Sequence, residues 1–264
     1  MIPCTRSSSS ACIKWCGLLA VVWLSLPMAA QEPSEVPLAI NLPTAEHLAD
    51  WDIGLVVNHR FLEPVRGASK DFYGLDEHAT VGIGFDFGIK AIPGLNAEIY
   101  RTADDKTVTL ALQEQVVAND RWRVAVRAER YDETYQGGPQ GGVFQVPVDW
   151  RLFDALTLSA VPTYLSRTAT AQHVVTTGIG ARWMVAEHQG ILAEYYPRPS
   201  KVYNGFEQGW SLAYQYRTQG HRFTIIATTI PGTTAHQVLG GDYEGYGPRS
   251  SNYWSLGFNL IRIF

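Results

Sequence analysis

The sequence predicts an all-β protein, a transmembrane antiparallel up-and-down β-barrel of the outer-membrane type with about 12 strands (10–12). Three observations predict this fold. Apolar and polar residues alternate from Trp51 to the C-terminus, the connections alternate between long and short, and the last strand ends on Phe264. Outer-membrane barrels with both termini in the periplasm have short periplasmic turns, long extracellular loops and an even strand number. A soluble barrel or sandwich has no physical reason to sort its loops in this way.

Residues 1–30 have the composition of a secretory signal peptide. Arg6 and Lys14 accompany the apolar run CGLLAVVWLSLPMAA, which is shorter than the about 20 residues of a spanning helix. We expect cleavage after Ala30. The three cysteines of the chain all lie in this segment, at Cys4, Cys12 and Cys16. The exported chain therefore has no cysteine for a disulfide, a thiolate metal site or a nucleophile.

The exported chain is acidic and has no basic cluster. Without residues 1–30, it carries 19 basic and 25 acidic side chains, a net charge of −6. This balance excludes nucleic acid as an expected partner. No second apolar stretch reaches the length of a spanning helix, so the sequence does not predict a helical membrane protein.

The exported chain divides into a leader and a barrel. Residues 31–50 are spaced by prolines and weakly periodic, so we expect an extended periplasmic leader. From residue 51 to 264 the period becomes two, as in TVGIGFDFGIK (80–90), which is the pattern of a strand with one apolar face. Twelve segments share this pattern: 51–61, 79–90, 94–101, 106–117, 121–131, 143–152, 155–165, 173–184, 190–197, 206–217, 221–230 and 251–264. They make up more than half of the exported chain, whereas strands make up about a quarter of globular proteins.

The connections between these segments support the barrel. Long ones such as LEPVRGASKDFYGLDEHA, SRTATAQH and RPSKVYNGF alternate with short ones such as AIP, AND, FDA and TQG. Successive strands of an up-and-down barrel cross the membrane in opposite directions, so connections of one kind gather at one end.

The polar faces of the strands indicate which side meets lipid. In RWRVAVRAERY (121–131), Arg123, Arg127 and Glu129 share one side with Arg121, and Trp122, Val124, Val126 and Ala128 share the other. Asp86 lies on the polar face of an earlier segment. A charge near the bilayer midplane costs about 2–4 kcal/mol, so we assign these charged residues to the lumen. A sandwich with charged outer faces is the alternative that alternation alone leaves open.

Aromatic residues near the segment ends predict two interfacial girdles. They are Trp51, Phe61, Trp122, Trp150, Trp183, Tyr195, Tyr196, Phe206, Trp210 and Trp254. Only the set as a whole supports the prediction, because a single Trp is more often ordinary packing than an interfacial anchor.

The last strand resembles the C-terminal signal by which the barrel-assembly machinery recognises outer-membrane clients. Leu256, Phe258, Leu260 and the terminal Phe264 match its alternating pattern, and Arg262 departs from it. We expect the Arg262 head group to reach water while its stem lies against lipid. We also expect this strand to pair with the first, because hydrocarbon does not tolerate an open sheet edge.

Five segments in order resemble an uncharacterised bacterial outer-membrane β-barrel family, a domain of unknown function. They are VVNHRF (56–61), DFYGLD (71–76), GIGFDFGI (82–89), GHRFTIIATT (220–229) and LGFNLIRIF (256–264). The resemblance covers about residues 51–264. It implies an outer-membrane β-barrel, and it implies no activity, because the family has no established catalytic residues.

The sequence offers little for chemistry. Its seven histidines form no HExxH or other metal-ligand spacing, so we expect no metal site and no cofactor. No GxSxG is present, although neighbouring strands can assemble a triad that one sequence conceals. His78 near Asp76 fits a turn capped by Asp76 better than a catalytic pair. We therefore expect no enzyme, with an outer-membrane hydrolase or acyltransferase as the minor alternative.

Arg60 and Asp76 are candidates for a constriction. Arg60 is expected to point into the lumen, and the first long loop could fold inward so that Asp76 meets it while Phe72 and Tyr73 pack inside. The glycines of the second segment leave space for such a loop, at Gly82, Gly84 and Gly88. The alternative is a surface loop with unpaired charges.

Twelve strands make a barrel between the small filled type and the wide sixteen-strand porins, so we expect a narrow lumen. Its mixed charges favour a porin-like channel for small polar solutes. The alternatives are a structural or ligand- or partner-binding barrel that acts through its extracellular loops, a lipid-modifying enzyme, and a soluble periplasmic β protein. The expected location is the outer membrane of a Gram-negative cell. Expected partners are outer-membrane lipid, the barrel-assembly machinery during biogenesis and a small polar solute.

Overall fold

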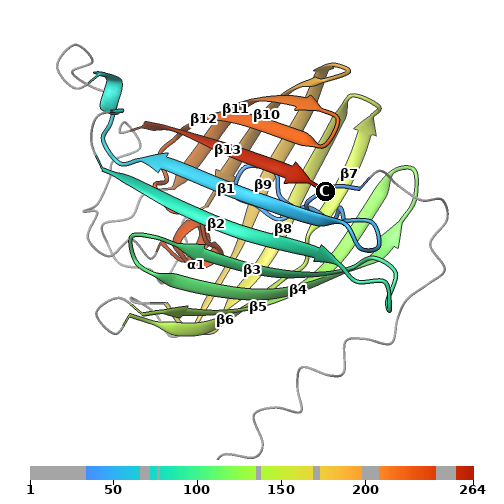
Figure 1. Cartoon of the computed structure of the whole chain (residues 1–264), viewed down its shortest axis with the longest axis horizontal. Helices are drawn as coiled ribbons and strands as arrows, with labels where there is room; N and C mark the ends of the chain where they lie inside the picture. Colours follow the sequence, from blue (N-terminus) through green and yellow to red (C-terminus); the bar gives the residue numbers. More distant parts are fainter. Residues whose placement is uncertain are drawn as a thin grey trace, which may run out of the picture.

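The fold is a β-barrel closed by its first and last strands (Figure 1). The computed structural model describes residues 34–65, 72–75, 78–134, 138–168, 173–197, 208–241 and 254–264. The expected signal peptide at 1–30 lies outside these residues. Among the described residues, no helix is long and apolar enough to cross a membrane.

The strands follow one another round the barrel in chain order. They are β1 (Ile53–Phe61), β2 (Ala79–Gly88), β3 (Leu95–Thr102), β4 (Thr107–Ala118), β5 (Trp122–Glu133), β6 (Gln140–Gln145), β7 (Val148–Phe153), β8 (Leu156–Leu165), β9 (Val174–Ala186), β10 (Gln189–Tyr196), β11 (Gly209–Thr218), β12 (His221–Thr228) and β13 (Ser255–Ile263). All neighbours are antiparallel, and β1 pairs with β13 from Gly54↔Ile263 to Arg60↔Gly257. The expected pairing of the last strand with the first is confirmed, and the ring excludes the sandwich.

Strands β6 and β7 are two halves of one barrel strand. Both pair with β5 on one side and with β8 on the other. The break falls at Pro147, which has no N–H for the ladder. Its carbonyl still accepts a hydrogen bond from the Ala125 N–H (2.9 Å), and the Val146 N–H donates to the Pro162 carbonyl (3.0 Å). The barrel therefore has the 12 strand positions that the sequence predicts.

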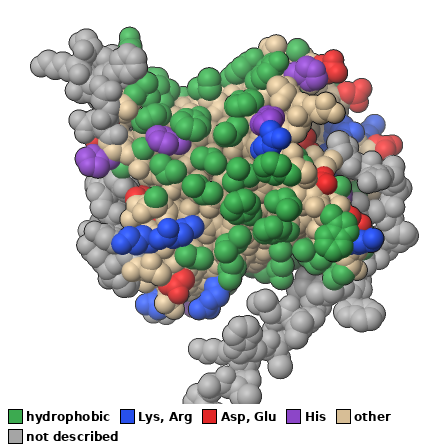
Figure 2. Space-filling view, viewed as in Figure 1, with side chains coloured by type: hydrophobic (Ala, Val, Ile, Leu, Met, Phe, Trp, Pro, Cys, Tyr) green, Lys and Arg blue, Asp and Glu red, His purple; other side chains and the backbone are tan. Residues whose placement is uncertain are grey.

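The outer face of the barrel is apolar and the inner face is mostly polar, as the alternation predicts. On β2, Ile83, Phe85 and Phe87 are exposed on the outside, while Thr80 and Asp86 are buried on the inside. Hydrophobic side chains cover the centre of the face shown in Figure 2. Since a membrane supplies hydrocarbon and no hydrogen-bond partners, this arrangement suits a barrel that spans it.

The two ends of the barrel carry different connections. One end, called the turn end here, holds the short turns 89–94, 119–121, 154–155, 187–188 and 219–220, together with the C-terminus. The opposite loop end holds the connections 62–78, 103–106, 134–139, 166–173, 197–208 and 229–254. The turn-end connections have two to six residues, and the loop-end connections are longer apart from 103–106 and 134–139, so the expected sorting is present in most of the barrel.

Residues 34–50, called the lumen hairpin here, fold into the barrel from the turn end. The chain reverses at residues 39–42, where Leu38 pairs with Pro43 and the Ala39 N–H donates to the Leu42 carbonyl (3.0 Å). This corrects the expectation of an extended periplasmic leader. The segment lacks period two because it lies among inward-facing side chains instead of joining the sheet.

Apolar residues of the lumen hairpin pack against apolar residues on the inner face of the wall. Three clusters result: Ile40 with Leu192, Ala213 and Ile226; Val36 and Leu48 with Val56 and Ile261; and Leu42 with Val161, Leu165, Val174 and others. An open aqueous pore would leave these wall residues in water. Their burial under the lumen hairpin indicates that the hairpin is an integral part of the folded barrel.

A second segment enters from the loop end. The connection after β12 contains α1 (Ala235–Gly240), whose Val238 and Leu239 join the cluster around Leu42 and Tyr131. The Gln237 side-chain carbonyl accepts hydrogen bonds from the N–H groups of Thr233 (3.0 Å) and Thr234 (3.2 Å). Gly241, with φ 69°, adopts the left-handed conformation that ends the helix. The two inserted segments therefore meet inside the barrel.

The outward assignment of the apolar face can be tested at Ile225, in the middle of β12. Ile225 is 65% exposed on the outer face. We expect Ile225→Arg to lower the free energy of unfolding in lipid vesicles by about 2–4 kcal/mol, measured by denaturant titration. Ile225→Phe keeps an apolar side chain there and serves as the control. Equal unfolding free energies for the two variants would contradict the assignment.

Candidate functional site

The candidate site is the lumen, and Glu194 on β10 holds the turn of the lumen hairpin inside it. The Glu194 carboxylate accepts hydrogen bonds from the backbone N–H groups of Ile40 (2.8 Å), Asn41 (2.9 Å) and Leu42 (3.2 Å). It also accepts one from the Tyr196 hydroxyl. Because this buried carboxylate gathers several donors away from water, these bonds are stronger than surface ones. Glu194 therefore fixes how far the hairpin reaches.

Arg60 on β1 is fully buried and contacts the same turn. Its Nη2 donates to the Asn41 side-chain oxygen (2.8 Å), and its Nη1 donates to that of Asn259 on β13 (2.8 Å). The Asn259 amide donates in turn to the Ile40 carbonyl (2.8 Å). Arg60 thus lies in the lumen as expected, where it contacts the lumen hairpin.

The first long loop differs from the constriction hypothesis in its described part. Tyr73, in the short 3₁₀ turn η1 (Phe72–Gly74), is 52% exposed, although we expected it to pack inside. Asp76 lies outside the described residues, so the Arg60–Asp76 pair stays a prediction.

The glycines of β2 make room for Tyr100. A Cβ atom at Gly82 or Gly84 would collide with the Tyr100 ring from β3. The Tyr100 hydroxyl donates to the Thr233 hydroxyl (2.9 Å) and accepts from the Asn58 amide (3.1 Å). The space expected to receive the first loop is therefore filled by a wall side chain that reaches the inserted α1 connection.

Three arginines hold the arms of the lumen hairpin near the turn end. Arg182 on β9 forms two contacts with the Glu46 carboxylate (2.5 and 3.2 Å), and Glu35 pairs with Arg217 (2.7 Å) and Arg222 (3.1 Å). Burial by itself raises the pKa of the Glu46 carboxyl, but attraction by the three arginines outweighs burial and holds that pKa below its usual range. Glu46 is therefore ionised, and its pairs with the wall persist at neutral pH.

Wall side chains also form hydrogen bonds with the backbone N–H and carbonyl groups of the lumen hairpin. The Gln113 amide donates to the carbonyls of Thr44 (2.8 Å) and Glu46 (3.1 Å). The Asp149 carboxylate accepts from the Ala45 N–H (2.8 Å). Buried backbone groups need such partners, and here the wall takes the role that a neighbouring strand has in a sheet.

A polar chamber remains between the lumen hairpin and the wall formed by β1–β6. Its cavity, of about 50 Å³, is lined by the predicted lumen residues Asp86, Arg127 and Glu129, together with Glu98 and others. Arg127 donates to Glu98 (2.9 Å) and Glu129 (3.2 Å). The chamber thus brings together three carboxyl groups and one guanidinium, so its lining is rich in oxygen atoms.

Several oxygens at this chamber have no hydrogen-bond partner among the described residues. They are Asp86 Oδ1, Glu129 Oε1, Asn58 Oδ1 and Gln145 Oε1. All four belong to buried side chains, and buried acceptors need donors. The chamber is therefore suited to water, cations and solutes that carry hydrogen-bond donors.

Arg123, the remaining predicted lumen residue, lies elsewhere. It is buried on the inner face of β5, directly opposite Asp149 on β7 and close to the turn end. It is not part of the chamber lining. The predicted lumen residues thus share the inner face, and the chamber brings together only Asp86, Arg127 and Glu129.

The C-terminal strand has the expected orientation. Phe258 and Phe264 are exposed on the outer face, and Leu260 is half-buried there. The Arg262 guanidinium lies 4.8 Å from the centre of the Phe264 ring and contacts His221. These positions suit an outward-facing signal, and its recognition by the assembly machinery stays a prediction.

The girdle prediction fails at Tyr196. Its neighbour Tyr195 is exposed on the outer face, but Tyr196 is buried in the lumen beside Glu194. Adjacent strand residues point to opposite faces, so one member of this Tyr–Tyr pair had to point inward.

Sequence reasoning missed Glu194, Arg182, Arg217 and Arg222, although each occupies an inward position of a strand. Strict alternation of β10 (QGILAEYY) would have placed Glu194 on the inner face. The better signal for an inserted segment is Leu192 on that same inner face, because a large apolar residue there requires cover from water.

The matching family model and two solved structures agree with this architecture. A family model described as a membrane bound beta barrel domain (DUF5777) matches residues 37–264. The NanC porin structure in a rhombohedral crystal form is similar, with 10% identity and a TM-score of 0.51 over 80% of this chain and 98% of that chain. The KdgM porin is similar with 7% identity and a TM-score of 0.52, over 81% and 99%. No curated protein matches the chain.

The family model covers most of the chain, so the chain belongs to this membrane-bound β-barrel family. The expected resemblance to a β-barrel domain of unknown function is confirmed. The match begins within the lumen hairpin and continues through every strand. The two porin structures, at such low identity, support the fold alone.

The role of Glu194 can be tested by hydrogen exchange. Glu194→Ala removes the acceptor of three backbone N–H groups, and we expect the amides of Ile40, Asn41 and Leu42 to exchange at least about tenfold faster, because a hydrogen bond to a charged group contributes about 1.5–3 kcal/mol. Glu98→Gln is the matched control, since Glu98 binds Arg127 and not the hairpin. Unchanged exchange in Glu194→Ala would show that Glu194 does not hold the turn.

Proposed function

We propose that the chain, as a member of this membrane-bound β-barrel family, forms a narrow porin-like channel for small polar solutes in the outer membrane of Gram-negative cells. The observation that carries the proposal is the polar chamber between the lumen hairpin and β1–β6. It is an acceptor-rich space inside a closed barrel whose outer face is apolar. A barrel whose only role is structural has no need of charged, unpaired acceptors in its interior.

The inserted segments set the size limit of the proposed channel. The lumen hairpin fills the turn end, where it contacts β1, β4, β7, β9, β10 and β13, and the α1 connection occupies part of the loop end. What remains for a solute is the chamber side, past Asp86, Glu98 and Glu129. We infer that only ions and small polar solutes pass, and that the hairpin is the main barrier to larger ones.

The charge of the chamber indicates a preference among solutes. Three carboxyl groups and one guanidinium face a space with low-dielectric walls, where the field of each carboxyl group that ionises is strong. The unpaired acceptors add to this field. We therefore propose a preference for cations and for solutes rich in hydrogen-bond donors over anions.

The other expected partners form part of the same proposal. The apolar outer face would contact outer-membrane lipid, and the exposed Phe258 and Phe264 would be read by the barrel-assembly machinery. The two similar structures are named porins, which supports transport over catalysis.

Deleting residues 34–48 tests the channel and its barrier together. Without these residues, we expect the barrel to keep its heat-modifiable migration in detergent gels and its single-channel conductance in planar bilayers to rise several-fold over the intact exported chain. The reason is that the deleted segment fills the turn end of the lumen. A folded deletion variant without any conductance would contradict the channel.

Selectivity is tested with neutral chamber variants. In Asp86→Asn combined with Glu129→Gln, the cation-to-anion permeability ratio should fall toward unity, because two of the three carboxylates lose their charge. The ratio is obtained from reversal potentials in a salt gradient. Asp132→Asn, on the outward side of β5, is the matched control and should keep the ratio of the intact chain. An unchanged permeability ratio in the chamber variant would contradict the proposed role of the chamber in cation selectivity.

A further inference from the structure

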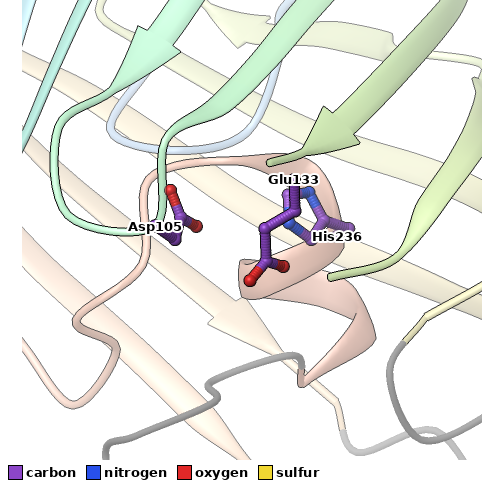
Figure 3. A group of neighbouring side chains, drawn as sticks. All are labelled: Asp105, Glu133 and His236. Atoms are coloured by element: carbon purple, nitrogen blue, oxygen red, sulfur yellow. The ribbon is translucent and has the colours of Figure 1, made fainter. Parts of the chain in front are cut away.

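Three side chains with metal-binding groups meet at the loop end (Figure 3). Asp105 lies in the connection between β3 and β4, Glu133 is the last residue of β5, and His236 belongs to α1. Each offers one ligand atom, and these atoms lie within 4.8 Å of one another. Two of the ligands therefore come from a wall strand and from a connection between wall strands, and the third comes from the inserted segment.

His236 is oriented like a metal ligand. It is fully buried, and its ring stacks on Tyr131 with centroids 4.1 Å apart. Its Nδ1 lies 3.0 Å from the Thr234 hydroxyl, while its Nε2 is buried with no hydrogen-bond partner among the described residues. When Nδ1 donates to Thr234, the lone pair of Nε2 stays free for a ligand. Metal-binding histidines are commonly oriented by such a bond to the other ring nitrogen.

The protonation state of His236 agrees with this role. Burial lowers the pKa of His236 to about 4, against an opposing attraction from Asp105. The ring is therefore neutral at neutral pH, and a neutral imidazole is the form that binds metals.

Asp105 is held in place from both sides. Its Oδ1 accepts hydrogen bonds from the Thr107 N–H (3.0 Å) and from the Thr102 hydroxyl. Its Oδ2 accepts from the Gln237 amide of α1 (2.5 Å). Partners of this kind fix a ligating carboxylate in position. Asp105 and His236 are therefore already positioned relative to one another through α1.

We propose that Asp105, Glu133 and His236 bind one divalent transition-metal ion, such as Zn²⁺ or Mn²⁺, and that the ion fastens α1 to the barrel wall. Two carboxylates with one imidazole suit these ions, whereas Ca²⁺ and Mg²⁺ prefer oxygen ligands alone. Bonds of about 2.0–2.2 Å from Zn²⁺ to nitrogen and oxygen require ligand atoms that are close neighbours, and these three lie within 4.8 Å of one another. Water would complete the coordination.

Metal binding would favour the arrangement in which α1 lies inside the barrel and narrows the lumen at the loop end. An ion that binds only when α1 lies against the wall stabilises that arrangement by mass action. The consequence for transport rests on the proposed channel function: bound metal lowers conductance at the loop end. The binding itself does not depend on the channel function, so the two can be tested apart.

The binding test uses the exported chain without an affinity tag, folded in detergent and stripped of metal with a chelator. Calorimetric titration with Zn²⁺ should give one saturable site per chain. His236→Gln and Glu133→Gln should each weaken this site at least about tenfold, the range seen when a ligand or its support is lost. His221→Gln, a histidine variant at the turn end, should bind as the intact chain does. Heat-modifiable migration confirms that each variant is folded.

Coordination is tested with Co²⁺ in place of Zn²⁺. We expect visible absorption bands of protein-bound Co²⁺ in the intact chain and in His221→Gln, and their loss in His236→Gln. A structural role of His236 alone would not produce them. Absence of saturable Zn²⁺ binding in the intact chain, or equal binding by all variants, overturns the site.

The effect on transport is tested in planar bilayers. Zn²⁺ added at the loop end should lower the conductance of the intact chain, and His236→Gln should not respond. If Zn²⁺ binds and conductance stays constant, the regulatory half of the proposal is wrong. If Zn²⁺ binds and the intact and hairpin-deleted chains never conduct, the metal site stands and the channel function fails.

Discussion

The structure depends on one constraint, which is that hydrocarbon offers no hydrogen-bond partners to a peptide backbone. A sheet in a membrane must therefore close on itself, and here the pairing of β1 with β13 closes it from Gly54 to Arg60. Closure gives every strand one face toward lipid and one toward an enclosed interior. The apolar outer face follows from it, and so does the gathering of charged side chains such as Asp86 and Arg127 inside.

The same constraint explains how segments can enter the interior. The lumen hairpin and the α1 connection carry backbone groups that also need partners, and the polar inner wall supplies them. Glu194 accepts from three consecutive hairpin N–H groups, and Gln113 donates to two hairpin carbonyls. Side chains of the inner wall therefore supply the hydrogen bonds that a neighbouring strand would supply in a sheet. Apolar residues such as Leu192 pack against the apolar residues of the hairpin.

The inserted segments fill only part of the lumen, and the proposals on function rest on buried polar groups that lie beside these segments. Beside the hairpin, the chamber keeps oxygens of Asp86 and Glu129 without a partner among the described residues. At the loop end, His236 keeps a buried nitrogen in the same condition. Packed interiors rarely leave such groups unsatisfied. The chamber oxygens suit a polar solute that passes through the lumen, and the His236 nitrogen suits a metal ion that remains bound.

The sequence by itself determined the class of fold, the 12 strand positions, the sorting of connections and the inward assignment of Asp86, Arg123, Arg127 and Glu129. The sorting follows from the lengths of the connections, and the others follow from local alternation, which one strand displays without reference to any other. Only the tertiary structure decided that residues 34–50 lie inside, that Tyr100 fills the space at Gly82, and that Asp105, Glu133 and His236 meet. These arrangements join residues far apart in the chain, such as Ile40 and Glu194 at a separation of 154 positions. No local period records such a contact, because it exists only once the barrel has closed.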